Sequence, residues 1–122
     1  MRTALLALVT LPIGLSASPA SAINGHYKGA GSEPGGYRWQ LDAKVTSATG
    51  GRHRVVLQST NANCASQTEG IGRLRGKMLD VHGDCRLTIT LTGRSMAVKE
   101  HPGCAYHGAL CTFDGTLTKV SR

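Results

Sequence analysis

The stretch CRLTITL, residues 85–91, predicts the fold class most directly. Cys85, Leu87, Ile89 and Leu91 alternate with polar residues, so an extended segment would have one apolar and one polar face. Residues 37–45, YRWQLDAKV, alternate in the same way. This period of two is typical of strands that bury one face, and the sequence therefore indicates an all-β protein.

Further short alternating segments, separated by glycine-rich turns, lie on both sides of these two. A hairpin turn is expected at Gly50-Gly51, because glycine tolerates positive φ, and a loop is expected over residues 29–36. The predicted strands cover residues 25–28, 37–45, 54–59, 66–75, 77–82, 85–91, 96–99 and 112–120. An open sheet of eight strands would expose two edges, so we expect either a small antiparallel β-barrel or a two-sheet sandwich, with the first and last strands paired.

The N-terminus resembles a secretory signal peptide. Arg2 precedes an apolar run over residues 4–15, and small residues end at Ala22. The run is too short to span a bilayer. We expect residues 1–22 to be removed and residues 23–122 to form one domain, exported to the periplasm or secreted, with no membrane span in the mature chain.

The charge favours anionic partners. Without Arg2, the 14 basic residues fall to 13 against 7 acidic residues, a net charge of +6. The basic residues are spread from Lys28 to Arg122 and form no run of the kind that marks a nucleic-acid arm, so no specific nucleic-acid partner is expected. They indicate either a solvated surface or attraction to an acidic protein or an anionic envelope component.

The four cysteines, Cys64, Cys85, Cys104 and Cys111, predict two disulfides in an exported domain of this size. Three pairings are possible. We expect Cys64–Cys85 and Cys104–Cys111, because each closes a local loop, with stabilisation of roughly 3.4 and 2.5 kcal/mol in the chain-entropy model.

The segment HPGCAYHGALC, residues 101–111, also has short histidine–cysteine spacings that would suit a metal. An oxidising compartment would convert its thiols to a disulfide, and Gly108 suits a tight cross-linked loop, so we expect no metal and no cofactor. Binding of a metal by His101 and His107 beside an intact disulfide is the alternative.

No sequence motif points to catalysis. There is no G-x-S-x-G, H-E-x-x-H, P-loop or dinucleotide fingerprint, and the cysteine spacing does not match a catalytic dithiol. We therefore expect no enzymatic activity. Asp114, between Phe113 and Gly115, is expected to face solvent near the last strand.

The block GCAYHGALCTFDGTLTKV, preceded by DCRLTITL, resembles a class of small exported bacterial β domains of unknown function that end in a cysteine-containing loop and a Phe-x-Gly strand. The resemblance covers residues 84–120 and implies a bacterial envelope protein without catalysis. A weaker likeness, in architecture alone, is to the periplasmic lysozyme inhibitors. Their Ser-Gly-x-x-Tyr loop is not found, so no inhibitory residue is transferred.

These observations lead to three hypotheses about function. The first is a non-enzymatic, envelope-associated binding module whose ligand the sequence does not specify. The second is a periplasmic inhibitor of a lysozyme-like hydrolase. The third is a metal-binding protein that uses the His101/His107 loop.

Overall fold

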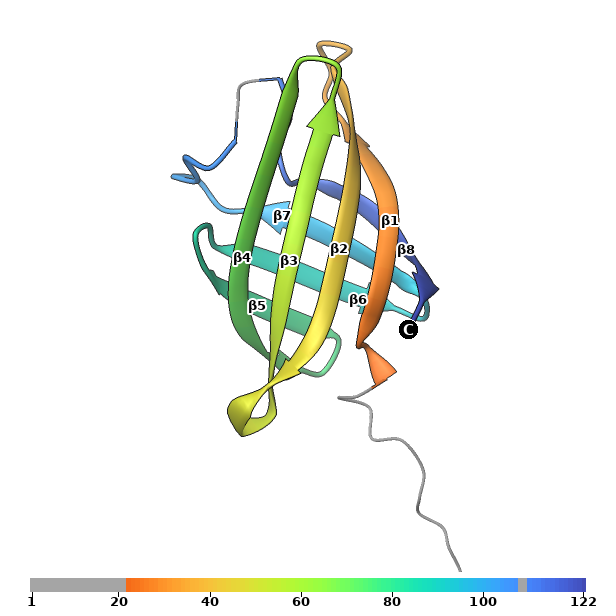
Figure 1. Cartoon of the computed structure of the whole chain (residues 1–122), viewed down its shortest axis with the longest axis vertical. Coiled ribbons are helices and arrows are strands. Elements are labelled where there is room, and N and C mark those ends of the chain that lie inside the picture. The colour runs from red at the N-terminus through yellow and green to blue at the C-terminus, as the bar shows by residue number, and fades with distance from the viewer. Residues whose placement is uncertain (1–21, 108–109) are drawn as a thin grey trace, which may run out of the picture.

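A computed structural model describes residues 22–107 and 110–122, and the strands within them form one closed antiparallel barrel (Figure 1). Each strand pairs with its neighbours in chain order, and the first strand pairs with the last. The strands are β1 (Gly25–Ser32), β2 (Arg38–Ala48), β3 (Arg52–Asn61), β4 (Cys64–Arg75), β5 (Met78–Gly83), β6 (Leu87–Thr92), β7 (Ser95–Glu100) and β8 (Gly115–Ser121). The all-β prediction is confirmed, and the barrel is selected over the sandwich.

The inward residues are those that alternation predicts. Along β2, every second residue from Trp39 to Val45 is buried, and residues 85–91 show the same pattern around β6. Among the described residues, eighteen apolar residues are buried in the core, and Trp39, Tyr27 and Phe113 are the largest of them. Burying this apolar surface is the main stabilising contribution to a domain of this size.

The first strand is longer than the sequence suggested. Residues 29–32 were expected in a loop, but Ala30 pairs with Gln40 on β2 and with Thr116 on β8. Gly29 and Gly31 are extended residues that permit close packing: a Cβ on Gly29 would lie 1.9 Å from the Thr116 carbonyl oxygen. Glycine density was therefore misread as a loop signal where it marks close approach of two strands.

The predicted Gly-Gly turn is confirmed. A 3₁₀ turn, η2 (Thr49–Gly51), connects β2 to β3, and Gly50 and Gly51 have φ values of 73° and 74°. That left-handed conformation is costly for a residue with a Cβ. In Figure 1 this hairpin extends from the lower end of the barrel.

The expected signal peptide lies outside the described residues except for Ala22. No helix in the described part of the chain has the length and apolar character needed to cross a membrane.

Candidate functional site

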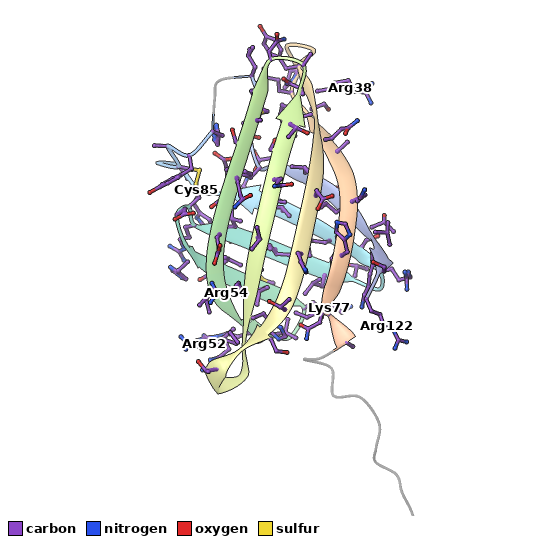
Figure 2. All side chains as sticks on the ribbon, viewed as in Figure 1. Arg38, Arg52, Arg54, Lys77, Cys85 and Arg122 are labelled. Atoms are coloured by element: carbon purple, nitrogen blue, oxygen red, sulfur yellow. A yellow bond between two sulfur atoms is a disulfide. The ribbon has the colours of Figure 1, made fainter. Side chains whose placement is uncertain are left out.

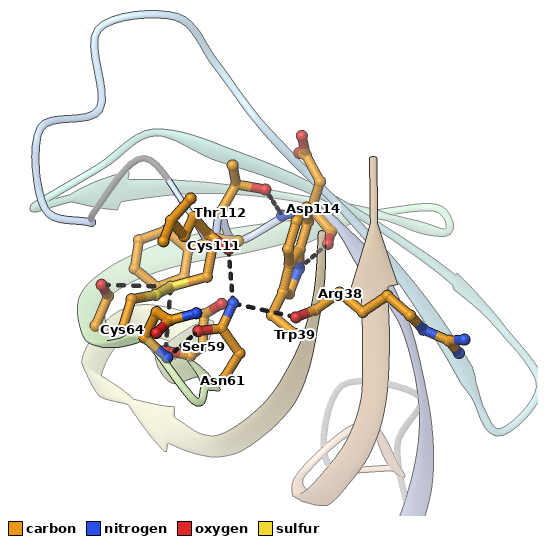
Figure 3. Close-up of a disulfide and its surroundings, with 12 residues drawn as sticks. Arg38, Trp39, Ser59, Asn61, Cys64, Cys111, Thr112 and Asp114 are labelled. Atoms are coloured by element: carbon orange, nitrogen blue, oxygen red, sulfur yellow. Dashed lines mark hydrogen bonds between the residues drawn. A yellow bond between two sulfur atoms is a disulfide. The ribbon is translucent and has the colours of Figure 1, made fainter. Parts of the chain in front are cut away.

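The cysteine-rich segment is cross-linked to the barrel and not to itself. The disulfides are Cys64–Cys111 and Cys85–Cys104, with Cα–Cα distances of 6.4 and 5.0 Å. Two disulfides were predicted correctly, but the expected local pairing, Cys64–Cys85 with Cys104–Cys111, is wrong. The local pairing was expected from nearness in the sequence alone. In the folded barrel, the chain that follows β7 passes the end of the barrel where β4 begins, so Cys111 lies beside Cys64 (Figure 3).

Asn61 also holds this segment at the end of the barrel. Its Nδ2 donates hydrogen bonds to the carbonyl oxygens of Leu110 and Arg38, at 2.7 and 3.1 Å. Its Oδ1 accepts a hydrogen bond from the backbone N–H of Asn63, at 2.7 Å (Figure 3). One side chain at the β3–β4 turn thus ties three stretches of backbone together.

Glu100, the last residue of β7, anchors the other side of the segment. Its carboxylate accepts a hydrogen bond from the Phe113 N–H at 2.9 Å, and its other oxygen lies 2.7 Å from His107 Nε2. The Glu100 and His107 side chains are each 14% exposed, and the His107 ring packs edge-on against Phe113 with 5.5 Å between centroids. Breaking a partly buried hydrogen bond to a carboxylate is costly, so these contacts hold His107 and Phe113 to the end of β7.

Asp114 does not face solvent freely, contrary to expectation. Its Oδ1 accepts a hydrogen bond from the Glu100 N–H at 2.7 Å, and its carbonyl oxygen accepts one from Trp39 Nε1 at 2.9 Å (Figure 3). Alternation failed here because residues 112–114 precede β8 and are not part of a strand. Asp114 therefore has a structural role in joining β7 and β2 to the C-terminal strand.

The two histidines proposed as metal ligands bond to different partners. His101 Nε2 lies 2.7 Å from Thr88 Oγ1, and His107 contacts Glu100. Within residues 22–107 and 110–122, one group of three potential ligands converges: Glu100, Cys104 and His107, whose ligand atoms lie within 4.8 Å of one another. The sulfur of Cys104 forms the disulfide with Cys85, which lies outside this group. Cys104 therefore offers no thiolate to a metal.

The hollows that could receive a ligand lie on the outer surface. One of about 610 Å³ is lined by Arg38, Gln40 and Asn61 among others, and an adjoining one of about 450 Å³ extends over the outward residues of β1, β2 and β3. A third, of about 390 Å³, lies over β3, β4 and β5 and is lined by Arg52, Arg73 and Arg75. The inward positions are already occupied by side chains, so recognition has to use the outer face.

Three basic side chains, those of Arg52, Arg73 and Arg75, line one hollow of the barrel wall, and Lys77 follows in the turn after β4. Arg52, Arg73, Arg75 and Lys77 are exposed, and none of the four forms an ion pair with a carboxylate of the described residues. Figure 2 places Arg52 and Lys77 in the lower half of the barrel and Arg38 at its upper end. Along the chain, the basic residues are dispersed from Lys28 to Arg122. The Arg-x-Arg spacing at residues 73–75, in a strand, was the signal that could have revealed this convergence.

The acidic residues near this end are already paired. Arg54 forms an ion pair with Glu69, and Asp80 accepts hydrogen bonds from Arg86. The hydrogen bonds from Arg86, and secondarily from His82, lower the pKa of Asp80 below its usual value. Asp80 thus stays ionised as the partner of these two side chains, and the neighbouring arginines lack a counter-ion.

Comparison with known proteins yields no relative: no family model, no curated protein and no solved structure matches this chain. The fold and the arrangement of side chains therefore provide the basis for any statement about function.

Proposed function

We propose that this protein is an exported, non-enzymatic binding module that recognises an anionic component of the bacterial envelope through its outer surface. The observation that carries the proposal is the set of three exposed arginines, Arg52, Arg73 and Arg75, that share one hollow and form no ion pair with a carboxylate of the described residues. Uncompensated charge of one sign on one part of a surface attracts ligands of opposite charge.

Two further features support this proposal. The barrel interior is packed with apolar side chains, so an internal ligand of the kind that larger barrels hold has no room. Both disulfides form in the fold, which agrees with an oxidising, exported location.

A binding titration tests the proposal. Disulfide-intact protein is titrated at low ionic strength with an anionic polysaccharide and with an uncharged polysaccharide of the same length. We expect saturable binding to the anionic polymer alone, and a dissociation constant that rises steeply with salt because counter-ions compete for the cations. If neither polymer binds at micromolar concentration in low salt, or if both bind equally, recognition of an anionic ligand is refuted.

A further inference from the structure

The hollow over β3, β4 and β5 brings three arginines together by strand register. Arg52 on β3 is the direct partner of Arg73 on β4, and Arg75 follows two residues later on the same face of β4. The hollow between them has a volume of about 390 Å³. Like charges on directly opposed positions of two strands destabilise a sheet, so this arrangement costs stability unless an anion is bound.

The acidic neighbour that could neutralise Arg73 is committed elsewhere. Asp80 is opposite Arg73 in the β4–β5 pairing, yet its carboxylate bonds to Arg86 at 3.2 and 3.3 Å and to His82 at 3.2 Å. Among the described residues, no carboxylate lies within ion-pair distance of Arg52, Arg73 or Arg75. Asp80 also lines the hollow, so three arginines stand against one carboxylate that is bonded to other side chains, and the hollow keeps a net positive charge.

Arg52 is held in position for a ligand. Its Nε donates to the Thr49 carbonyl oxygen at 3.0 Å and one terminal nitrogen lies 3.3 Å from Thr49 Oγ1, which leaves the other terminal nitrogen unengaged. Guanidinium groups present planar, forked donors that match the oxygens of phosphate and sulfate. A fixed arginine loses less conformational entropy when it binds such a group.

The surroundings of the hollow favour a glycan over a lipid surface or a nucleic acid. Among the described residues that line it there is no Trp, Tyr or Phe, and its one aromatic ring, His82, is hydrogen-bonded to Asp80, so unpaired bases would find a poor stacking platform. Among the described residues, Met78 is the only exposed large apolar side chain on β3, β4 or β5. A single such residue would anchor the protein only weakly to a lipid bilayer.

We propose that the hollow lined by Arg52, Arg73 and Arg75 binds a sulfate or phosphate group carried on an acidic glycan. This inference rests on the proposed function and specifies the site and the ligand class. The three guanidinium groups supply the hydrogen-bond donors.

The test compares two double variants that lose the same charge. Arg73→Gln/Arg75→Gln removes two arginines of the hollow, whereas the control, Arg38→Gln/Lys44→Gln, removes two exposed cations of β2 outside it. Dextran sulfate is titrated into each protein by calorimetry, with uncharged dextran, anionic phospholipid vesicles and single-stranded DNA as separate probes. We expect the dissociation constant for dextran sulfate to rise about tenfold or more in the hollow variant and less than threefold in the control.

A thermal melt accompanies each titration. Because the hollow variant relieves repulsion between opposed arginines, its melting temperature at low salt should not fall below that of the wild type, so weaker binding cannot come from misfolding. Equal weakening in both variants would overturn the site while leaving the proposed function intact. Tighter binding to vesicles or DNA than to dextran sulfate would overturn the glycan assignment. If the wild-type protein binds none of the anionic probes, both the inference and the proposed function are refuted.

Discussion

Removing the Cys64–Cys111 disulfide by the double substitution Cys64→Ala/Cys111→Ala should destabilise this protein more than removing the Cys85–Cys104 disulfide. The disulfide joins residues 47 positions apart, whereas Cys85–Cys104 joins residues 19 apart. Closing these loops in the unfolded chain is worth about 4.1 and about 3.3 kcal/mol, respectively, in the chain-entropy model. Since a domain of this size is stable by roughly 5–15 kcal/mol, the first loss removes a large fraction of the total.

Equilibrium urea unfolding measures this effect. The free energy of unfolding of Cys64→Ala/Cys111→Ala should fall by about 4 kcal/mol, and alkylation of the variant without reductant should modify no thiol, because Cys85 and Cys104 remain paired. A matched control, Cys64→Ala/Cys85→Ala, removes one cysteine from each disulfide and should leave two thiols without their native partners. Two reactive thiols in the first variant would refute the pairing.

Tryptic digestion of the unreduced wild type gives an independent check of connectivity. Cys64 lies in the fragment of residues 55–73, Cys85 in residues 78–86, and both remaining cysteines in residues 100–119. The pairing in the structure joins all three fragments into one species. Local pairing would instead link residues 55–73 to 78–86 and leave residues 100–119 as a separate fragment, a result that would contradict the structure.

Three further changes test other parts of the fold. Glu100→Ala should lower the free energy of unfolding by about 2–3 kcal/mol, measured in urea, because it leaves a backbone N–H and the His107 ring without their acceptor; a loss below 0.5 kcal/mol would refute this anchor. Burial lowers the pKa of His53 below its ordinary 6.5, so the unfolded chain takes up a proton before the folded protein does. The stability of the wild type relative to His53→Gln should therefore be greatest above pH 6.5 and decrease as the pH falls toward 5 in a series of thermal melts, and a flat or opposite trend would contradict the assignment. Gly29→Ala should cost about 1–3 kcal/mol, because its Cβ would meet the Thr116 carbonyl oxygen across the β1–β8 pairing; an unchanged urea midpoint would show that the two strands separate without penalty.

The all-β class could be predicted from the sequence because its strongest signal, the alternation of apolar and polar residues, is local. Alternation in residues 85–91 and in β2 identified the inward side chains without any knowledge of the partner strands. The need to remove two sheet edges left a closed barrel and a two-sheet sandwich as alternatives, and the β1–β8 pairing, which was expected, closes the barrel. Glycine was the ambiguous residue: Gly50 and Gly51 mark a turn, whereas Gly29 marks close packing of strands.

The candidate sites depended on relations that no local pattern encodes. Arg52 and Arg73 are 21 positions apart, and only the β3–β4 register places them opposite each other. Their lack of a counter-ion depends in turn on Asp80 bonding to Arg86 and His82. A shift of one residue in the β3–β4 pairing would turn the side chains of one strand to the other face of the sheet. Arg52 and Arg73 would then no longer lie side by side.

The sequence by itself determined the fold class, the inward faces of the strands and the presence of two disulfides, because each follows from residue types and spacings along the chain. Only the tertiary structure decided which cysteines pair, whether Asp114 is bonded, and where the basic charge gathers. The physical reason is that these features require two segments distant in the chain to meet, and the register and closure of the barrel set where they meet.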